Sequence, residues 1–326
     1  MHIGSLEEFI EIPLHISGFW RPIYTEDVLS TGSLGAGLVL KPMTFIKAVN
    51  EEKIYINSTP FDLEHLKIVK ERYGYARGLY VKTSVPLGVG AGVSGNISIG
   101  LGYNLASKIY TKDLFKRIVF AGIIGHEIEV IARTGLGDVI AELSGAGIEE
   151  RVRNGSLCKG VIINHHIKED VKVLLIVLRE RIYTPEMLKL YSDKFYSLHE
   201  RAYRIFSRSY DIDSFIEASY YFSKEIGFLR KDVDEKISSI LADYQRKGDV
   251  LGYFIKKSLL IIIYRSDADV KSICDNMRFL GEECIFLEIT DRPIIDSKAL
   301  DEKLCETLLR DRDEILKKKI ILQTDI

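Results

Sequence analysis

The sequence predicts an α+β protein built from two domains, and three observations carry this prediction. The chain has 326 residues, of which 46% are hydrophobic and 28% charged, as expected for a globular protein with room for about two domains. Its first half opens with strand-like segments that give way to helices, without the regular alternation of a parallel α/β sheet. Beyond about residue 160 the pattern starts again and is typical of a split βαβ, ferredoxin-like domain. We therefore expect one domain over 1–165 and a second over 166–326.

Short runs of β-branched and aromatic residues, separated by turn residues, fill the segment 6–84 and predict strands. Only the segment 60–74 interrupts them, because its apolar residues follow helical spacing among charged ones. Two longer helices are expected over 94–110 and 111–135, on either side of a short break. The first domain is thus predicted to begin with strands and to continue with helices.

Polar and glycine residues mark the expected ends of these helices. Gly74 follows the last apolar position of the first helix, where a glycine commonly ends a helix. Thr111 is a candidate N-cap for the third helix, and Gly135 is its expected stop.

The second half contains further segments with clear patterns. Two strands are expected within 158–181, and helices over 184–207 and 211–228. A further helix leads into the apolar strand segment 253–265, and a helix followed by a strand is expected within 267–289. This order produces the split βαβ arrangement.

Composition and residue spacing exclude several classes of function. Forty-five basic and 47 acidic residues give a net charge of −2, so we expect neither nucleic acid nor a membrane as a partner. The longest apolar runs are far below the roughly 18 residues that a spanning helix needs, and no targeting segment is visible, which predicts a cytoplasmic protein. HEIEV is not the zinc motif HExxH, and the adjacent His165 and His166 have no spaced partner. Four cysteines without a CxxC pair are expected to be reduced thiols: Cys158, Cys274, Cys284 and Cys305.

A glycine-rich loop over 86–100, PLGVGAGVSGNISIG, lies between an expected strand and an expected helix. Backbone amides and a helix N-terminus can together bind phosphate at such a place, although a tight turn without a ligand explains a bare GxGxxG about equally well. Gly90, Gly92 and Gly95 spell GxGxxG, but no strand separates them from Asp113, as a dinucleotide-binding fold requires. No Lys-Ser or Lys-Thr follows the glycines, so a P-loop does not fit either.

Two further glycine clusters accompany this loop. The segment 30–40, STGSLGAGLVL, is on its own most simply a turn into a strand. The segment 135–139, GLGDV, follows a helix in which His126 and Glu129 are three residues apart and so share a face. Each of these side chains also has a purely structural interpretation: a buried histidine, a solvated charge and, for Asp138, a helix cap.

Taken together, these clusters resemble the GHMP kinase superfamily, which includes galactokinase and the homoserine, mevalonate and phosphomevalonate kinases. Their phosphate loop, P-x-G-x-G-x-G-S-S, is matched here by Pro86, Gly88, Gly90, Gly92, Val93 and Ser94, with Val93 in place of the first serine. The chain resembles archaeal pantoate kinases more closely, through HISGFW at 15–20, GSLGAG at 32–37, His126 with Glu129, RTGLGDV at 133–139 and IEERVRNG at 148–155.

The resemblance implies a two-domain GHMP kinase fold, with an N-terminal part like domain 2 of ribosomal protein S5 and a ferredoxin-like C-terminal part. It implies that Ser94 and Glu129 hold Mg²⁺ and that Asp138 is the catalytic base. It also implies that pantoate is bound by Ser33, His126 and Arg151. The loop implied to bind ATP consists of Pro86, Gly88, Gly90, Ala91, Gly92, Val93, Ser94 and Gly95.

The implied activity is the ATP- and Mg²⁺-dependent phosphorylation of pantoate to 4-phosphopantoate in coenzyme A biosynthesis, by a homodimer. Alternatives are a GHMP kinase for homoserine, shikimate or mevalonate, a nucleotide-binding sensor without turnover, and an NAD-dependent oxidoreductase with a Rossmann site at Gly90. Arg153 is a rival to Arg151 for the pantoate carboxylate, because residues two apart share a strand face. The glycine-rich third motif of other GHMP kinases is absent; Leu251 and Gly252 in VLGYFIKKS resemble the M-L-G of pantoate kinases.

Overall fold

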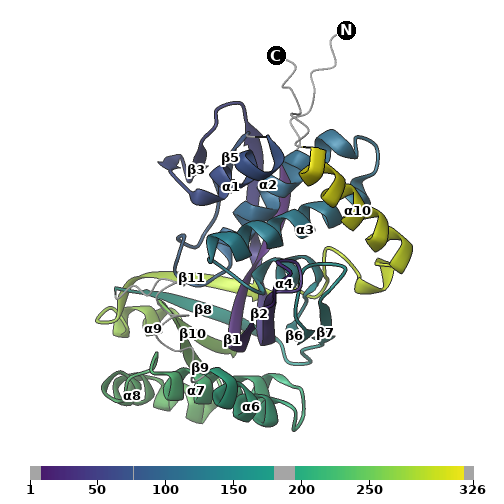
Figure 1. The fold of residues 1–326 in the computed structure, drawn as a ribbon. Coiled ribbons are helices and arrows are strands. Elements are labelled where there is room, and N and C mark those ends of the chain that lie inside the picture. Colours follow the sequence, from purple (N-terminus) through teal and green to yellow (C-terminus); the bar gives the residue numbers. More distant parts are fainter. Residues whose placement is uncertain (1–8, 76, 180–194, 319–326) are drawn as a thin grey trace.

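The computed structural model describes residues 9–75, 77–179 and 195–318 (Figure 1). Its strands are β1 (Phe9–Ile23), β2 (Gly32–Val49), β3 (Ile54–Ile56), β4 (Thr59–Phe61), β5 (Gly78–Lys82), β6 (Ile148–Arg153), β7 (Val161–His165), β8 (Val171–Leu178), β9 (Val250–Lys256), β10 (Leu259–Arg265) and β11 (Gly281–Ile289). Its helices are α1 (Glu64–Tyr73), α2 (Val93–Ile109), α3 (Leu114–Ala132), α4 (Asp138–Ser144), α6 (Phe195–Phe206), α7 (Ile212–Ile226), α8 (Lys231–Lys247), α9 (Lys271–Asn276) and α10 (Glu302–Lys318), with the 3-10 helix η1 (Ser297–Ala299). This succession of elements confirms the predicted α+β class.

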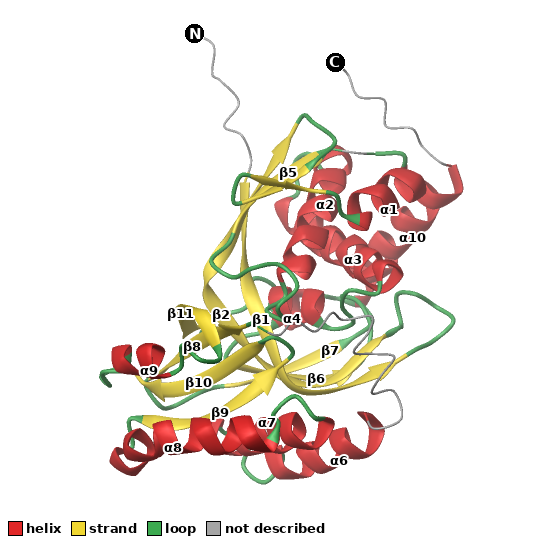
Figure 2. Ribbon diagram, turned by 90° about the vertical axis from the view of Figure 1, so that its left-hand side faces the viewer, coloured by secondary structure: helices red, strands yellow, loops and turns green. Residues whose placement is uncertain are grey.

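Within the described residues, eleven strands form one mixed sheet. Its main path runs β4-β3-β5-β2-β11-β8-β10-β9, and β1, β6 and β7 join through pairing with β2 or with each other. The long antiparallel hairpin of β1 and β2 passes through both halves of the molecule (Figure 1). Helices α1, α2 and α3 lie on one side of the N-terminal strands, and α6, α7 and α8 form a layer beneath β9 and β10 (Figure 2).

The second half has the topology that the sequence predicts. Strands β8, β9, β10 and β11 are arranged as β11-β8-β10-β9, and each neighbouring pair is antiparallel. This is the strand order of a split βαβ, ferredoxin-like unit. Of the helix expected over 184–207, the part 184–194 lies outside the described residues, and the rest contains α6.

Two predicted helix ends are wrong. Helix α3 begins after Asp113 and not after Thr111, because the Asp113 carboxylate accepts a hydrogen bond of 3.0 Å from the Lys116 amide. It ends at Arg133 and not at Gly135, because Arg133 itself adopts the left-handed conformation and turns the chain. The first helix does end at Gly74, as predicted.

The C-terminal part of the chain returns to the N-terminal half at two places. Strand β11 pairs with β2 through Glu288 and Ile289, which continues the sheet from one half into the other. Helix α10, drawn in yellow in Figure 1, lies beside α3, where Arg312 pairs with Glu127. The division into two domains at residue 165 stays a prediction. Both the β11–β2 pairing and the contact between α10 and α3 would join the two domains.

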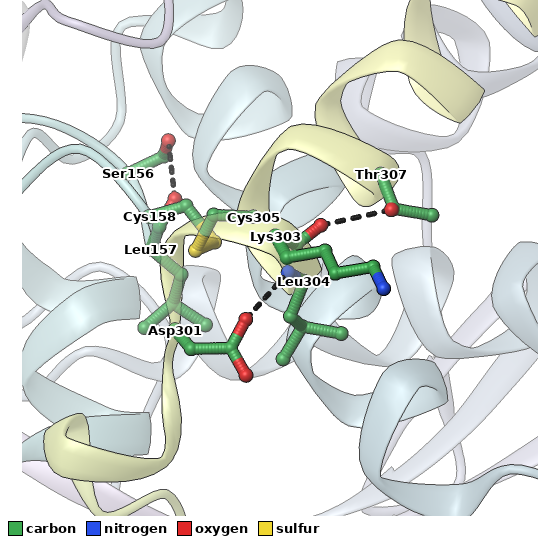
Figure 3. The surroundings of a disulfide bond; sticks show 8 residues. All are labelled: Ser156, Leu157, Cys158, Asp301, Lys303, Leu304, Cys305 and Thr307. Carbon is green, nitrogen blue, oxygen red and sulfur yellow. Dashed lines mark hydrogen bonds between the residues drawn. A yellow bond between two sulfur atoms is a disulfide. The ribbon is translucent and has the colours of Figure 1, made fainter.

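The four cysteines are paired in the structure, so the expectation of reduced thiols is wrong. Cys158 is bonded to Cys305, 147 residues away, with Cα atoms 5.3 Å apart (Figure 3). Beside this bond, the Asp301 carboxylate accepts a hydrogen bond of 2.7 Å from the Leu304 amide at the start of α10. The second bond joins Cys274 and Cys284. Spacing along the sequence could not reveal pairs that only the fold brings together.

Among the described helices, none is both long and apolar enough to cross a membrane.

Candidate functional site

A cavity of about 630 Å³ lies where the glycine-rich loop, the end of α3 and the β9–β10 turn meet. Its volume falls in the range of small-molecule sites. Part of its lining consists of apolar side chains of the β3–β4 region, including Ile56, Phe61 and Leu63. Another part consists of polar groups, among them Ser33, Asp138 and Lys256. The cavity therefore offers both apolar and charged groups to a ligand.

The glycine-rich loop follows β5 and leads directly into α2. Gly88, Gly90 and Gly92 all have positive φ angles, which glycine adopts without strain. Gly92 is the N-cap of α2, and no side chain caps this helix. A Cβ atom at residue 92 would lie only 2.1 Å from Glu142 Oε1, so a larger residue there would displace the Glu142 side chain. The loop and the helix N-terminus thus form a setting that suits phosphate oxygens.

The structure brings most of the predicted loop residues to the cavity wall. Residue 95 is an exception, because Gly95 lies inside α2 and faces Glu142. No second parallel strand follows α2, since the chain continues directly into α3. This order contradicts the βαβ unit that the dinucleotide-binding alternative requires. The predicted loop residues that line the cavity are Pro86, Gly88, Gly90, Ala91, Gly92, Val93 and Ser94.

Glu129 is buried, with an exposed fraction of 2%, so it is not a solvated helix charge. Its Oε2 atom accepts a hydrogen bond of 3.1 Å from Ser94 Oγ, across the gap between α3 and α2. Its Oε1 atom accepts hydrogen bonds from Ser98 at 3.0 Å and from Thr134 at 2.8 Å, and contacts His65 at 3.0 Å. These contacts fix the carboxylate beside the cavity.

Ser94 and Glu129 fit a magnesium ion by their chemistry, since Mg²⁺ prefers a few protein oxygens together with water and phosphate oxygens. Their direct hydrogen bond shows that the hydroxyl and the carboxylate can reach one point. Among the residues that the structure describes, no group of three or more His, Cys, Asp or Glu could hold a metal alone. A ligand phosphate would have to complete the coordination.

Asp138 is the first residue of α4 and lines the cavity. The N-cap position belongs to Gly137, so Asp138 does not cap this helix. Its Oδ1 atom lies 2.7 Å from His15 Nδ1. Burial alone would raise the pKa of Asp138, but the charge of Lys256 and the hydrogen bond to His15 outweigh burial and hold that pKa well below its usual range. Asp138 is therefore a carboxylate that stays ionised beside the cavity.

A chain of polar groups behind Asp138 was missed by the sequence reasoning. His15 is fully buried, and its Nε2 atom lies 2.8 Å from Glu149 Oε1. Arg151 pairs with the same Glu149 oxygen and donates a hydrogen bond of 3.2 Å to Ser17 Oγ. His15 and Ser17 alternate along β1, so a period of two in HISGF was the available signal.

The three predicted substrate residues lie at different depths. Ser33 lines the cavity, and Arg151 lies buried behind Ser33 and Gly137. His126 is buried away from the cavity lining, with its Nε2 atom 2.8 Å from the Thr31 carbonyl oxygen. Burial lowers the pKa of His126, so the ring is neutral and donates to that carbonyl. His126 therefore positions the turn that precedes Ser33.

Arg151 and Arg153 do not share a strand face as expected. The pairing of β6 with β7 shifts register between these two residues, which interrupts the alternation of side chains. Arg151 is buried and Arg153 is exposed. The structure places Arg151, and not Arg153, next to the cavity.

Glu142, on α4, is a further buried carboxylate that the sequence did not single out. It is fully buried, and neither of its oxygens accepts a hydrogen bond of normal geometry from the described residues. Burial and the nearby charges of Asp138 and Glu129 raise the pKa of Glu142 well above its usual value. The folded protein therefore favours the protonated, neutral form of Glu142.

Replacing Glu142 by glutamine is expected to stabilise the protein above its acidic range. The folded chain retains a proton on Glu142 that the unfolded chain releases near pH 4.5, so the wild type loses stability as pH rises beyond that value. Glu142→Gln removes this loss, and its free energy of unfolding should exceed that of the wild type by about 1–3 kcal/mol near neutral pH.

Urea denaturation at about pH 5 and about pH 8 measures the effect, which should grow with pH. Glu225→Gln, an exposed carboxylate on α7, is the matched control and should change stability by less than about 0.5 kcal/mol. A Glu142→Gln protein that is less stable than the wild type at both pH values would contradict this prediction, and would show that the folded protein stabilises the charged form of Glu142.

Comparisons with known proteins support the sequence resemblance. No protein-family model matches the chain. It is 34% identical over 195 residues to a pantoate kinase of Thermococcus kodakarensis, covering 54% of this chain and 61% of that protein. It is 26% identical over 241 residues to a pantoate kinase of Methanocaldococcus jannaschii, covering 71% of this chain and 83% of that one. The match to the first relative thus spans less than two thirds of its length.

Solved structures confirm the fold. A phosphotransferase related to the CoA biosynthesis pathway superposes with a TM-score of 0.69 and 24% identity, covering 87% of this chain and 97% of the other. The mevalonate kinase of Methanococcus jannaschii superposes with a TM-score of 0.58 and 13% identity, covering 89% and 100%. At these identities the likeness shows the fold alone, which is that of the GHMP kinases.

Proposed function

We propose that this chain is an ATP-dependent kinase that phosphorylates pantoate to 4-phosphopantoate. The observation that carries the proposal is the convergence on one cavity of a glycine-rich phosphate loop, the Ser94–Glu129 pair and the ionised Asp138. The similarity to two archaeal pantoate kinases supports the choice of substrate. The reaction would be a step of coenzyme A biosynthesis.

Phosphoryl transfer requires neutralisation of the phosphates and an aligned acceptor hydroxyl, with little covalent work for the protein. Backbone amides of the glycine-rich loop would bind the triphosphate, and the nucleotide base would lie beside the apolar side chains of Ile56 and Phe61. Ser94 and Glu129 would hold Mg²⁺, which neutralises charge on the phosphate oxygens. Asp138, kept ionised by its neighbours, would accept the proton of the acceptor hydroxyl.

Pantoate has a carboxylate and two hydroxyl groups, so it needs a cation and a few hydrogen-bonding partners. Arg151 is the guanidinium that the fold places behind the polar part of the cavity lining, with Ser33 at the wall beside it. His126 would act indirectly, by holding the Thr31 carbonyl and thereby the turn before Ser33. A homodimer and a cytoplasmic location are further parts of this proposal, and both rest on the family resemblance.

The direct test incubates the protein with ATP, Mg²⁺ and pantoate and measures the mass of the product. The expected result is a product heavier than pantoate by one phosphoryl group, together with one ADP per product. Homoserine, shikimate and mevalonate are tested in parallel under the same conditions. Turnover of one of these without turnover of pantoate would overturn the substrate assignment, and ATP binding without any turnover would indicate a sensor.

Replacing Arg151 by alanine is expected to raise the KM for pantoate about 10- to 100-fold, because a charge-assisted hydrogen bond contributes about 1.5–3 kcal/mol. Steady-state kinetics at saturating ATP measure this change. Arg153→Ala is the matched control on the same strand and should leave the KM within about threefold of wild type, because Arg153 is exposed. A larger effect of Arg153→Ala would assign the carboxylate to Arg153. Thermal unfolding of Arg151→Ala separates lost binding from lost folding, since Glu149 also loses its partner.

A further inference from the structure

Two adjacent lysines from the C-terminal half line the cavity, and neither belongs to the motifs of the N-terminal half. Lys256 is the last residue of β9, and Lys257 begins the turn to β10. This turn is docked on the glycine-rich loop, because the Ser258 amide donates a hydrogen bond of 3.3 Å to the Val89 carbonyl. A Cβ atom at Gly90 would be 3.5 Å from the Lys256 carbonyl oxygen. The fold therefore fixes Lys256 beside the glycine-rich loop.

The Lys256 side chain is buried, with an exposed fraction of 7%, yet it lines the cavity. Its Nζ atom is 5.9 Å from the centre of the Trp20 ring, which also lines the cavity. Within the described part of the chain, no hydrogen bond or ion pair engages this ammonium group. Since burial of an unpaired charge is costly, an ammonium group in this position points to an anionic ligand.

Lys256 lies among charged groups, near both the proposed base and the glycine-rich loop. Burial lowers the pKa of Lys256, and the charges of Asp138 and Glu149 oppose this effect, whereas the charge of Arg151 adds to it. The charge of Lys256 is also the strongest factor that keeps Asp138 ionised. Lys256 thus lies near the proposed base on one side and the phosphate loop on the other. A phosphoryl group passing from the loop towards Asp138 would pass within its reach.

We propose that Lys256 donates hydrogen bonds to the phosphoryl group during its transfer and neutralises the charge that develops on it. This inference rests on the proposed function. The bond between the γ-phosphorus and its bridging oxygen breaks, a bond from that phosphorus to the acceptor hydroxyl oxygen forms, and the hydroxyl proton goes to Asp138. ADP leaves with the electron pair of the broken bond, and Lys256 keeps its own protons throughout. The C-terminal half in this way supplies a catalytic residue to a site built mainly by the N-terminal half.

The test replaces Lys256 by methionine, which has a similar shape without the charge. We expect kcat for pantoate phosphorylation to fall about 10²- to 10³-fold, as when one donor to a transition state is removed. The affinity for ADP with Mg²⁺, measured by calorimetry, should change less than about fivefold, because the loop amides remain. Affinity for ADP with Mg²⁺ and aluminium fluoride, which mimics the planar phosphoryl group, should weaken by a factor close to that of kcat. Lys256→Arg should recover part of both losses.

Lys247→Met, at the exposed end of α8, is the matched control and should leave all three measurements unchanged. Thermal unfolding of Lys256→Met beside wild type separates lost chemistry from lost folding, since Asp138 also loses the charge that keeps it ionised. A kcat within about threefold of wild type would overturn the inference, and so would a higher pantoate KM at unchanged kcat, which would assign Lys256 to the acceptor carboxylate. If the wild type does not phosphorylate pantoate, the proposed function falls, and binding of the aluminium fluoride complex still decides the role of Lys256.

Discussion

Replacing Asp138 by asparagine should lower kcat about 10²- to 10⁴-fold while nucleotide affinity stays nearly unchanged. The substitution keeps the size of the side chain and can keep a contact with His15, but it removes the group that accepts the hydroxyl proton. The glycine-rich loop and the Ser94–Glu129 pair are left in place, so ATP should still bind. Steady-state kinetics with pantoate and calorimetry with an ATP analogue measure the two quantities. Because kcat and kcat/KM should fall together, the lost interaction is one made in the transition state.

Asp243→Asn, an exposed carboxylate on α8, is the control and should be as active as wild type. Unchanged turnover in Asp138→Asn would return Asp138 to a structural role in the first turn of α4. The pH profile gives an independent check, because the hydrogen bond to His15 favours the charged form of Asp138 and so lowers its pKa. In His15→Ala the pKa of Asp138 should rise, and activity should be lost at higher pH on acidification than in the wild type. If the acid limb of the pH–activity profile is identical in both proteins, His15 does not lower the pKa of the base.

Local patterns predicted most of the elements and the glycine-rich wall of the cavity. The strand, glycine turn and helix around residue 92 follow from neighbours in sequence, and so does the position of Asp138 at the start of a helix. The spacing of His126 and Glu129 was less informative, because residues three apart on a helix differ in direction by about 60°. Glu129 faces Ser94, which lines the cavity, whereas His126 faces the Thr31 carbonyl.

The parts that sequence reasoning missed depend on contacts between distant elements. His15 meets Asp138 across 123 residues, and Lys256 enters the cavity from another half of the molecule. In sequence, Lys256 belongs to a strand next to a turn, where a lysine is ordinarily exposed. The bond between Cys158 and Cys305 is equally invisible before α10 is placed beside the N-terminal half. Periodicity predicts which face of an element is buried, but not what that face meets.

Replacing Arg312 by methionine should lower the free energy of unfolding by about 3 kcal/mol. Arg312, on α10, binds Glu127 Oε2 of α3 through Nε at 2.9 Å and through a second nitrogen at 2.8 Å. Glu127 is fully buried, and removal of one partner of a buried ion pair commonly costs about 3–5 kcal/mol. We expect the lower end of this range, because Arg72 and Tyr73 still contact the Glu127 carboxylate. The midpoint of urea denaturation measures the change.

Arg310→Met is the matched control two residues away on the same helix. The Arg310 side chain is 67% exposed, and its guanidinium lies as far as 3.9 Å from the Asp311 carboxylate. Its removal should therefore change stability by less than about 0.5 kcal/mol. Glu127 precedes Glu129 by two residues on α3, yet the two carboxylates have separate partners. The folded Arg312→Met protein should therefore keep its kcat at low temperature. A fall in kcat without a loss of stability would show instead that α10 holds Glu129 in its position, and that the C-terminal helix positions the proposed site.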